Sequence, residues 1–258
     1  MEIIEEELNK IKTLKTELDR LRPLSPDQIT NLKKRFDVEF TYNSAAIEGN
    51  TFSFLETKIL LTEGITVGGK TMREHLEIIN HKEAIDYIEE LAHKKRTELK
   101  RTDVLNIHSI VLRGIDAENA GRYRTAPVYV LLKNGGKHIF CDPLKINDEM
   151  DIFYNWLFSQ NEKDPLLIAA EAHTRFVNIH PFIDGNGRTA RLLMNLILLQ
   201  NGYVPAVIKN SERVKYLDAL EHWQNSGNRD DFYKLVIRCE MESLEIYLKT
   251  IKEKIIWK

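Results

Sequence analysis

Twelve consecutive residues, 180–191, bring several chemically active side chains together. They read His-Pro-Phe-Ile-Asp-Gly-Asn-Gly-Arg-Thr-Ala-Arg. The Gly-Asn-Gly run takes positive φ at low cost, so successive backbone N–H groups can point into one concavity. An apolar helix pattern follows directly, and the N-terminus of a helix favours a bound anion. The stretch therefore predicts an anion-binding turn at the start of a helix.

The charged side chains of this stretch extend the prediction. Arg188 and Arg191 are three residues apart, so both guanidinium groups can lie on one side of the helix. Two permanent cations beside a nest of backbone amides suit a polyphosphate. Asp184 has no evident cationic partner in the sequence and would suit a Mg²⁺ ion that also binds phosphate oxygens. His180 adds a titratable base at the entrance to the turn.

The same twelve residues resemble, position for position, the signature of the Fic family, His-x-Phe-x-[Asp/Glu]-Gly-Asn-Gly-Arg-x-x-Arg. The resemblance implies a mainly α fold, a Fic-type helical bundle with one β-hairpin flap. It also implies a protein adenylyltransferase that uses ATP and Mg²⁺. Such an enzyme moves AMP to a Ser, Thr or Tyr hydroxyl of a target protein, or of itself, and releases pyrophosphate.

The resemblance also implies a role for each residue of the motif. His180 would be the general base that takes the proton from the target hydroxyl, and Asp184 would hold Mg²⁺. The nucleotide phosphates would be bound by Gly185, Asn186, Gly187, Arg188 and Arg191. Within that set Arg191 would hold the γ-phosphate, and Phe182 would anchor the loop in the core.

A second pattern lies upstream, in Ser-Ala-Ala-Ile-Glu-Gly at residues 44–49. Ser44 and Glu48 are four apart, hence neighbours on one helical face, and Gly49 is a natural helix end. The pattern resembles the family's inhibitory helix, [Ser/Thr]-x-x-x-Glu-[Gly/Asn], here at about 37–49. The resemblance implies that Glu48 pairs with Arg191, so that ATP enters with its α-phosphate misplaced for attack.

One segment breaks the helical pattern. Residues 128–132 and 137–140 are apolar runs that flank Lys-Asn-Gly-Gly, typical of a β-hairpin around Asn134-Gly135. A hairpin edge can pair with an extended peptide. Within the resemblance this segment is the flap, about 122–141, that aligns a target beside the site. Its expected target-positioning residues are Thr125, Pro127, Val128, Tyr129 and Val130.

Two alternatives lie outside this family's chemistry. Gly64–Thr71 fits the P-loop pattern Gly-x-x-x-x-Gly-Lys-[Ser/Thr] without a mismatch, so a P-loop ATPase is one of them. A P-loop needs a buried strand before it, whereas residues 54–61 space their apolar positions as a helix. We therefore expect a loop in which Thr71 caps the next helix. The other alternative, a non-catalytic binding module that uses the hairpin edge, would carry a degraded motif, and here the motif is complete.

Other reactions of the same site stay open. Glu48 could orient a water that removes AMP from a modified protein, and transfer of another phosphate-linked group such as phosphocholine uses the same motif. Phosphorylating, Doc-like relatives replace the second glycine with Lys, whereas position 187 here is Gly. Gly187 therefore favours AMP transfer.

The remaining sequence supplies the elements that must position these residues, and most of it reads as amphipathic helix. A stripe from Leu8 to Leu21 ends at Pro23, and a second pattern runs from Ser25-Pro26 toward Gly49. Further helices are predicted near 54–62, 72–93, 102–113, 145–160, 165–178, 188–201, 211–225 and 230–256. We expect one unit, 1–258, with N-terminal helices (1–100), a core (101–205) and C-terminal helices (206–258).

Bulk properties limit the partners. With 37 basic and 39 acidic residues the net charge is −2, so no global field draws the chain to nucleic acid or membrane. No apolar run approaches the roughly 20 residues that span a bilayer. Residues 1–7 are acidic where a targeting peptide would be basic, and Cys141 and Cys239 are isolated. We expect a cytoplasmic protein whose partner is a target protein with an accessible hydroxyl group, which can be the protein itself. A homodimer is plausible from relatives, but no residue marks it.

Overall fold

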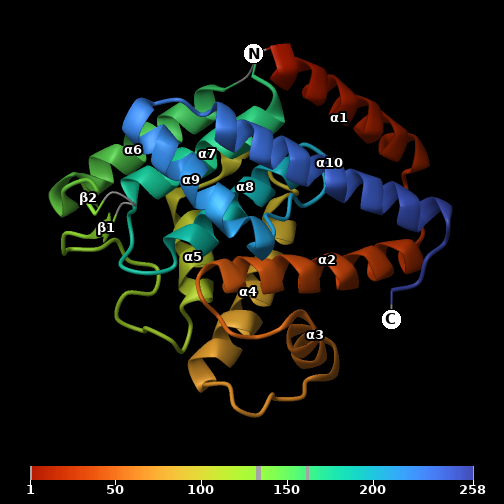
Figure 1. The fold of residues 1–258 in the computed structure, drawn as a ribbon, viewed down its shortest axis with the longest axis horizontal. Helices are drawn as coiled ribbons and strands as arrows, with labels where there is room; N and C mark the ends of the chain where they lie inside the picture. Colours follow the sequence, from red (N-terminus) through yellow and green to blue (C-terminus); the bar gives the residue numbers. More distant parts are fainter. Residues whose placement is uncertain (1, 132–134, 161–162, 258) are drawn as a thin grey trace.

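The protein is described here from a computed structural model that covers residues 2–131, 135–160 and 163–257. Helices dominate this part of the chain, together with a two-stranded sheet (Figure 1), which confirms the predicted fold class. The helices are α1 (Glu2–Leu21), α2 (Pro26–Ile47), α3 (Phe54–Glu63), α4 (Met72–Leu91), α5 (Arg101–Val111), α6 (Ile146–Ser159), α7 (Pro165–Ile179), α8 (Asn186–Gln200), α9 (Arg213–Ser226) and α10 (Asp230–Lys252).

Side-chain caps fix where several helices begin. Ser25, Ser53 and Thr71 each accept a hydrogen bond from the backbone N–H three residues on, and a Glu or Gln at that third position bonds back to the cap. The predicted starts at Ser25-Pro26 and Thr71 are confirmed. α8 begins at Asn186, two residues earlier than predicted, because Gly185 takes a φ of +77° and serves as its N-cap. α10 ends at Lys252 rather than at 256.

The centre of the bundle is formed by α7 and α8, consecutive helices that pack along each other (Figure 1). Leu192, Leu193, Met194, Leu196, Ile197 and Leu198 of α8 are all fully buried. A helix that is apolar all round belongs inside a core. Neighbours α4 and α5 cover α8, while α1 lies along α10 on the outside. The loop that joins α7 to α8 therefore leaves and re-enters the core within a few residues.

The segment expected to be inhibitory, about 37–49, is the second half of α2, which begins at Pro26 as predicted and ends at Ile47. Glu48 is its C-cap residue, and Gly49 follows with a φ of +99°. At this end Arg213, the first residue of α9, donates to the Ile47 carbonyl oxygen at 2.7 Å. These contacts fix the end of α2 next to α8 and α9 (Figure 1).

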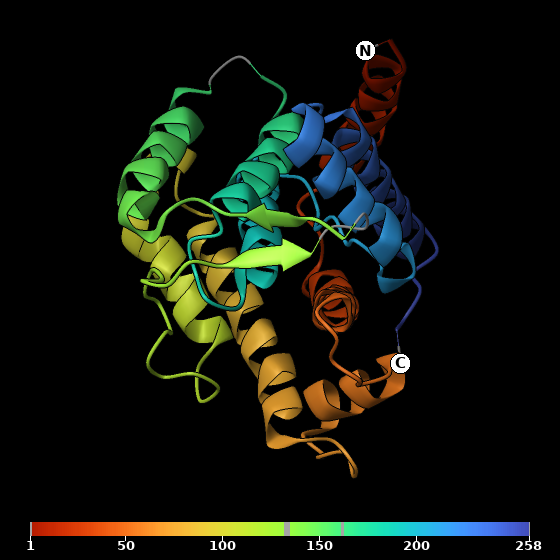
Figure 2. The same cartoon turned by 60° about the vertical axis from the view of Figure 1, so that its left-hand side comes forward.

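The hairpin consists of β1 (Tyr129–Leu131) and β2 (Lys137–Ile139), paired antiparallel with Tyr129 opposite Ile139. β1 begins one residue later and β2 ends one residue earlier than predicted, and residues 132–134, which include Asn134 of the predicted turn, lie outside the described residues. Figure 2 shows the two strands crossing in front of α7 and the start of α8. Three strand side chains, those of Tyr129, Leu131 and Ile139, are more than half exposed.

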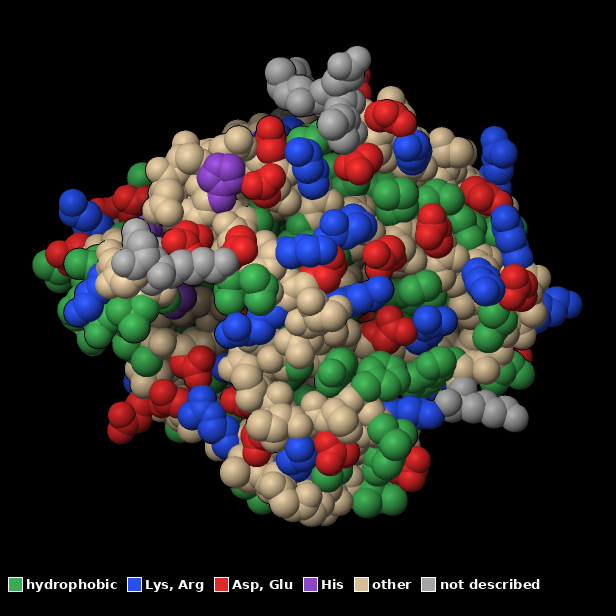
Figure 3. Space-filling model, viewed as in Figure 1, with side chains coloured by type: hydrophobic (Ala, Val, Ile, Leu, Met, Phe, Trp, Pro, Cys, Tyr) green, Lys and Arg blue, Asp and Glu red, His purple; other side chains and the backbone are tan. Residues whose placement is uncertain are grey.

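The surface carries both signs of charge. Figure 3 shows Lys and Arg side chains interspersed with Asp and Glu over one face of the molecule, in keeping with the net charge of −2. Within the described ranges, no helix has both the length and the apolar character that a membrane span needs.

Candidate active site

The α7–α8 loop turns sharply at both ends. His180 ends α7 in the left-handed region, with a φ of +52°, and its backbone N–H donates to the Phe176 carbonyl oxygen at 3.0 Å. Gly185 makes the second turn, also left-handed. A non-glycine residue at positive φ is uncommon and persists where its surroundings hold it. The side chains that hold this loop are therefore part of the site.

Two polar side chains brace the loop from within. Phe182 is fully buried and stacks on the His108 ring at 3.5 Å. His108 accepts from the Gly121 N–H through Nδ1 and therefore donates from Nε2 to the Asp184 carbonyl oxygen, at 2.9 Å each. Asn186 bonds the Phe182 backbone at both ends, accepting from its N–H at 3.0 Å and donating to its carbonyl oxygen at 2.8 Å.

The bonds of Asn186 correct one expectation. Its side-chain oxygen and nitrogen are both engaged inside the loop, and the residue is only 3% exposed. The group of Asn186 that remains open to an anion is its backbone N–H, in the first turn of α8. Sequence reasoning did not find His108, whose contacts in the loop lie 76 residues away along the chain.

A second residue missed from the sequence, Arg124, joins the hairpin to the loop. It is 2% exposed, and its backbone N–H donates to the Pro181 carbonyl oxygen at 2.9 Å. Its guanidinium donates to the carbonyl oxygens of His180 (2.8 Å), Ala126 (2.9 Å) and Cys141 (2.7 Å). One buried cation thus ties both ends of the flap to the backbone of His180. The available signal was its place near the start of the predicted flap, about 122–141.

The His180 ring is held in the neutral form. It stacks on Phe140, with ring centroids 3.9 Å apart, and Nδ1 donates to the Val177 carbonyl oxygen at 3.3 Å. That bond leaves the lone pair on Nε2. Burial lowers the pKa of His180 to about 4. The imidazole is therefore a free base near neutral pH.

Arg191 is held by four hydrogen bonds although it is only 1% exposed. Nε donates to Ser44 Oγ (2.9 Å), and Nη1 donates to Tyr216 Oη (3.2 Å). Nη2 donates to the Ser44 carbonyl oxygen and to Glu48 Oε1, at 2.8 Å each. Ser44 and Glu48 thus contact the same guanidinium. Tyr216, from α9, was not expected from the sequence.

The Glu48 carboxylate lies over the first turn of α8. An added Cβ at Gly187 would fall well inside van der Waals contact with Glu48 Oε1, so the Glu48 carboxylate could keep its present place only with a glycine at position 187. The Glu48 side chain is 39% exposed. An internal anion therefore occupies the N-terminal end of α8, where the amides and the helix dipole favour negative charge.

Arg188 and Asp184 belong to a separate ion-pair network. Arg188 is buried, with Nη2 3.1 Å from Asp184 Oδ1 and Nη1 3.5 Å from Glu77 Oε1. Asp184 Oδ2 also lies 2.7 Å from Arg73 Nη2. The expectation that Asp184 has no cationic partner was wrong, because Arg73 comes from α4, 111 residues away. Burial raises the pKa of Asp184, but Arg188, the Gly185 N–H and Arg73 outweigh it and hold the pKa below its usual value.

The residues present fit a magnesium ion that arrives with a polyphosphate. Such an ion takes one or two protein carboxylates and fills its other positions with phosphate oxygens and water. Asp184 offers one carboxylate, 41% exposed, beside the start of α8. Within the described ranges no group of three or more His, Cys, Asp or Glu residues could hold a metal ion by itself.

A cavity of about 380 Å³ lies beside these residues, and of the 180–191 motif only His180 and Gly187 line it; Asp184, Asn186, Arg188 and Arg191 do not. Its lining includes His180, Glu48, Gly187 and Val130, and on the far side Leu220 and Gln224 of α9. Of the other residues expected to position a target, Thr125, Pro127 and Tyr129 are exposed and Val128 is half-buried. None of those four lines the cavity.

The Gly64–Thr71 loop has a different setting. The helix α3 precedes it, in place of the strand that a P-loop requires. Lys70 Nζ donates to the Thr51 carbonyl oxygen at 2.6 Å, and Thr71 caps α4, as predicted. The P-loop alternative is therefore wrong.

Known proteins are similar to this chain in sequence and in fold. The model of the Fic/DOC family matches residues 98–198. A protein adenylyltransferase Fic from Aedes aegypti is 36% identical over 223 residues, which are 86% of this chain and 44% of the relative. The chain thus spans less than half the length of this curated relative.

Two solved structures extend the match over nearly the whole chain. A Fic domain containing signalling protein from Bacteroides thetaiotaomicron is 28% identical with a TM-score of 0.88, covering 96% of this chain and 98% of that one. A fragment of Fic-1 from Caenorhabditis elegans is 30% identical with a TM-score of 0.84, covering 98% of this chain and 74% of that one. The complete motif, its placement between α7 and α8 and these matches together mean that the chain belongs to the Fic/DOC family.

Proposed function

We propose that this protein transfers AMP from ATP to a hydroxyl group of a protein and that Glu48 restrains this activity. The observation that carries the proposal is the set of groups that line the 380 Å³ cavity. It joins a neutral imidazole, the N-terminal end of α8 and the carboxylate that engages Arg191. A relative that is 36% identical over 86% of this chain is named a protein adenylyltransferase.

In the transfer reaction the protein mainly positions the reactants, accepts one proton and neutralises negative charge. His180 Nε2 takes the proton of the target hydroxyl while the hydroxyl oxygen attacks the α-phosphorus of ATP. The bond from the α-phosphorus to the bridging oxygen breaks, and pyrophosphate leaves. The motif holds the reactants in line and stabilises the charge that develops on the phosphate oxygens.

The N-terminal end of α8 suits the phosphates. The free backbone amides of Asn186 and Gly187 point out of the first turn, and Arg188 adds a buried positive charge beside them. A Mg²⁺ ion held at Asp184 would neutralise phosphate charge when bound. Arg191 contributes to the γ-phosphate once Glu48 has moved, since Nη2 then has a free donor.

Glu48 opposes productive binding in two ways. Its carboxylate engages Nη2 of Arg191, and its negative charge lies over Gly187, where a phosphate would approach. Removal of the carboxylate leaves Arg191 with its bonds to Ser44 and Tyr216. The guanidinium therefore stays in place and gains a free donor, which favours release without loss of the fold.

The hairpin provides a surface for an extended target. Val130 and Leu131 of β1 line the cavity and are partly exposed, and Arg124 connects the flap to the backbone of His180. A strand added to this edge would bring its own side chains toward Nε2. The protein itself is one such target in this proposal.

One observation also favours removal of AMP as a second function. Glu48 is partly exposed inside the same cavity as His180, so its carboxylate has room to orient a water molecule. In that case Glu48 would be required for the reverse process while it restrains the forward one.

The test compares wild type, Glu48→Gly and Glu48→Gly/His180→Ala, each incubated with Mg²⁺ and ATP labelled at the α-phosphate. We expect label on protein in the Glu48→Gly variant, little in the wild type and none in the double variant. Equal labelling of both variants would remove His180 from its role. Labelled protein is then incubated with wild type and with Glu48→Gly, and loss of label only with wild type would establish AMP removal.

A further inference from the structure

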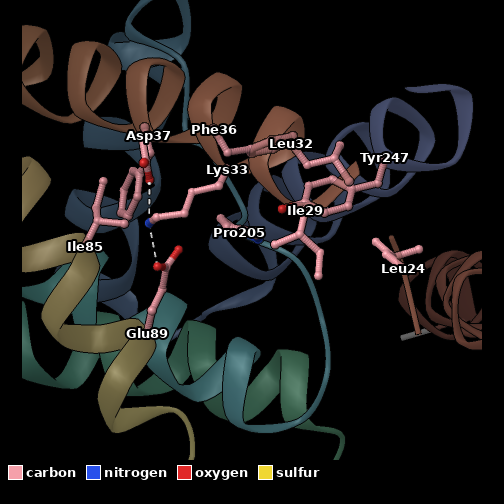
Figure 4. Close-up of a pocket in the computed structure, with 11 residues that line it drawn as sticks. Leu24, Ile29, Leu32, Lys33, Phe36, Asp37, Ile85, Glu89, Pro205 and Tyr247 are labelled. Atoms are coloured by element: carbon pink, nitrogen blue, oxygen red, sulfur yellow. Dashed lines mark hydrogen bonds and ion pairs between the residues drawn. The ribbon is translucent and has the colours of Figure 1, made fainter. Parts of the chain in front are cut away.

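A second cavity, of about 230 Å³, lies against the first half of α2. It is bounded by α2, α4, α10 and Pro205, and it shares no lining residue with the active-site cavity (Figure 4). Its walls are mostly apolar and include Leu24, Ile29, Leu32, Phe36 and Ile85. The space therefore lies between the proposed restraining helix and the body of the bundle.

One end of this cavity carries an excess of negative charge. Lys33 Nζ lies 2.5 Å from Glu89 and 3.3 Å from Asp37, both of which line the cavity (Figure 4). It also lies 2.9 Å from Asp86, which does not line it. Lys82 Nζ contacts the same Asp86 and Asp37, at 2.7 and 3.3 Å. Three carboxylates thus face two ammonium groups. Asp37 is 7% exposed, so this charge is poorly reached by solvent ions.

The opposite wall offers a free hydroxyl. The ring of Tyr247 packs on Phe36 with ring centroids 4.6 Å apart. Its phenolic oxygen has no hydrogen-bond partner among the residues that the structure describes, and burial raises the pKa of Tyr247, which keeps the hydroxyl protonated. An apolar space with an acidic end and an unpaired hydroxyl is the usual form of a small-molecule site.

We propose that this cavity is a regulatory site for a small apolar amine and that its occupation holds α2 against the bundle. The acidic end would take the ammonium group through charge-assisted hydrogen bonds, and the apolar walls would take the carbon body. A cavity of about 150 Å³ accepts benzene, so the larger volume here suits an aromatic ring with a short aminoalkyl chain.

α2 connects this cavity to the active site as one continuous helix. Along its inner face Lys33 and Asp37 contact α4, Thr41 Oγ1 lies 3.3 Å from His81 Nδ1, and Ser44 and Glu48 engage Arg191. The cavity exists while α2 is docked in this way. A ligand that fits the docked conformation must favour it, by linkage. Occupation of the cavity should therefore strengthen the restraint, a consequence that rests on the proposed function.

The binding test uses the full chain and three probes of one shape. We expect 2-phenylethylamine to bind saturably, by calorimetry and by a rise in Tm, and 2-phenylethanol to bind about tenfold more weakly. Phenylacetate should not bind. Equal binding of the amine and the alcohol would overturn the charge assignment, and no saturable binding of the amine up to about 10 mM would overturn the site.

Three variants locate the bound amine. Glu89→Gln should weaken binding of the amine and leave binding of the alcohol unchanged. Glu90→Gln, at an exposed neighbouring position on the same helix, should change the binding of neither probe. Ile29→Phe places a larger ring at the cavity wall from a position that is 53% exposed, and it should abolish binding of both probes without unfolding the chain. Unchanged amine binding in both Glu89→Gln and Ile29→Phe would overturn the location.

The effect of the bound amine on the restraint is measured separately, as a change in protein labelling. In the labelling assay the amine should lower the residual labelling by wild type and have no effect on Ile29→Phe or on Glu48→Gly. Higher labelling of wild type with the amine would overturn the predicted direction. Absence of label in Glu48→Gly would instead count against the proposed adenylyl transfer, and the binding results would stand independently of it.

Discussion

Two glycine-rich loops in this chain match phosphate-binding patterns, and the structure gives them opposite settings. The 180–191 loop joins two helices of the central core and is braced by His108 and Arg124. The Gly64–Thr71 loop joins α3 to α4 at the periphery, and most of its residues are exposed (Figures 1 and 2). The first has buried cations next to a helix N-terminus, and the second has one lysine bonded to a neighbouring carbonyl oxygen.

The difference shows what a phosphate site requires beyond glycines. Backbone amides bind an anion well when their geometry is fixed before it arrives, and that fixing comes from buried neighbours. In the 180–191 loop an internal anion, Glu48, already lies over Gly187. In the other loop an added Cβ at Gly68 would meet nothing within 4 Å. The space next to Gly187 is therefore already filled by an anionic side chain, whereas the space next to Gly68 is empty.

The largest contrast between the loops should appear in the transfer rate. In the Glu48→Gly background, His180→Ala removes the proposed base and should lower labelling by about 10²–10⁴-fold. Lys70→Gln, the residue that a P-loop would depend on, should leave labelling within about twofold, because its ammonium bonds Thr51. Initial rates at saturating ATP measure both. A large loss in Lys70→Gln would reopen the second loop as a nucleotide site.

A smaller loss is expected when the brace behind His180 is weakened. Arg124→Lys keeps the charge but loses most of the guanidinium's bonds to three carbonyl oxygens, so both the flap and the His180 backbone should loosen. We expect about 1–3 kcal/mol less stability toward denaturant. Labelling in the Glu48→Gly background should fall about tenfold, since the base is held less well.

The matched control for this variant is Arg122→Lys, two residues earlier and exposed. Because Arg124 acts through His180, its substitution should also raise the pKa of the His180 imidazole measured by NMR, as the ring becomes more solvated. A loss of stability with an unchanged His180 pKa would make Arg124 a purely structural residue.

The restraint itself can be tested from the glycine side. Gly187→Ala adds a Cβ where Glu48 Oε1 now lies, and the end of a flexible side chain is the group that gives way. We expect labelling several-fold above wild type, below that of Glu48→Gly, because the methyl group also narrows the phosphate site. Gly68→Ala in the other loop should leave labelling unchanged. Labelling of Gly187→Ala at or below the wild-type level, with the fold intact, would contradict this arrangement.

Prediction from sequence succeeded where the determinants are local. Helix starts at Ser25 and Thr71 follow from capping residues, and the buried α8 follows from its apolar run. The same local reading rejected Gly64–Thr71 as a P-loop. The identity of the motif came from a resemblance of twelve residues, which no periodicity supplies.

The missed features all depend on contacts between distant parts of the chain. Arg73 reaches Asp184 across 111 residues, and Arg124 reaches the His180 carbonyl oxygen across 56. Tyr216 joins Arg191 from α9. Nothing in the local pattern around any of these residues marks its partner, since each contact forms only when segments far apart in the sequence pack together. The side-chain bonds of Asn186 are a different case, because their partner, the backbone of Phe182, is only four residues away and residue types alone do not show that the amide is used inside the loop.

The smallest effect on transfer near neutral pH follows from the burial of His180. Since burial lowers its pKa to about 4, the imidazole is neutral from about pH 8 down to about pH 5. Transfer by Glu48→Gly should therefore show no histidine-dependent loss in that range and should fall as pH approaches 4, where Nε2 takes up a proton. A half-maximal rate near pH 6.5 would mean that the ring is solvated in solution, contrary to its stacking on Phe140.

Stability should respond over a neighbouring range with a defined sign. The pKa of His108 is also lowered to about 4 by burial, so the folded chain binds fewer protons than the unfolded chain between about pH 6.5 and 4. Each such histidine contributes stability that is present above about pH 6.5 and is lost as pH falls toward 4, at up to about 1.4 kcal/mol per pH unit. Replacement of exposed His222 by Gln leaves these buried groups unchanged, so the variant should follow the wild-type Tm profile. A Tm that stays constant from pH 7 to 5 would place the His108 and His180 rings in water and would remove the main physical distinction between the two loops.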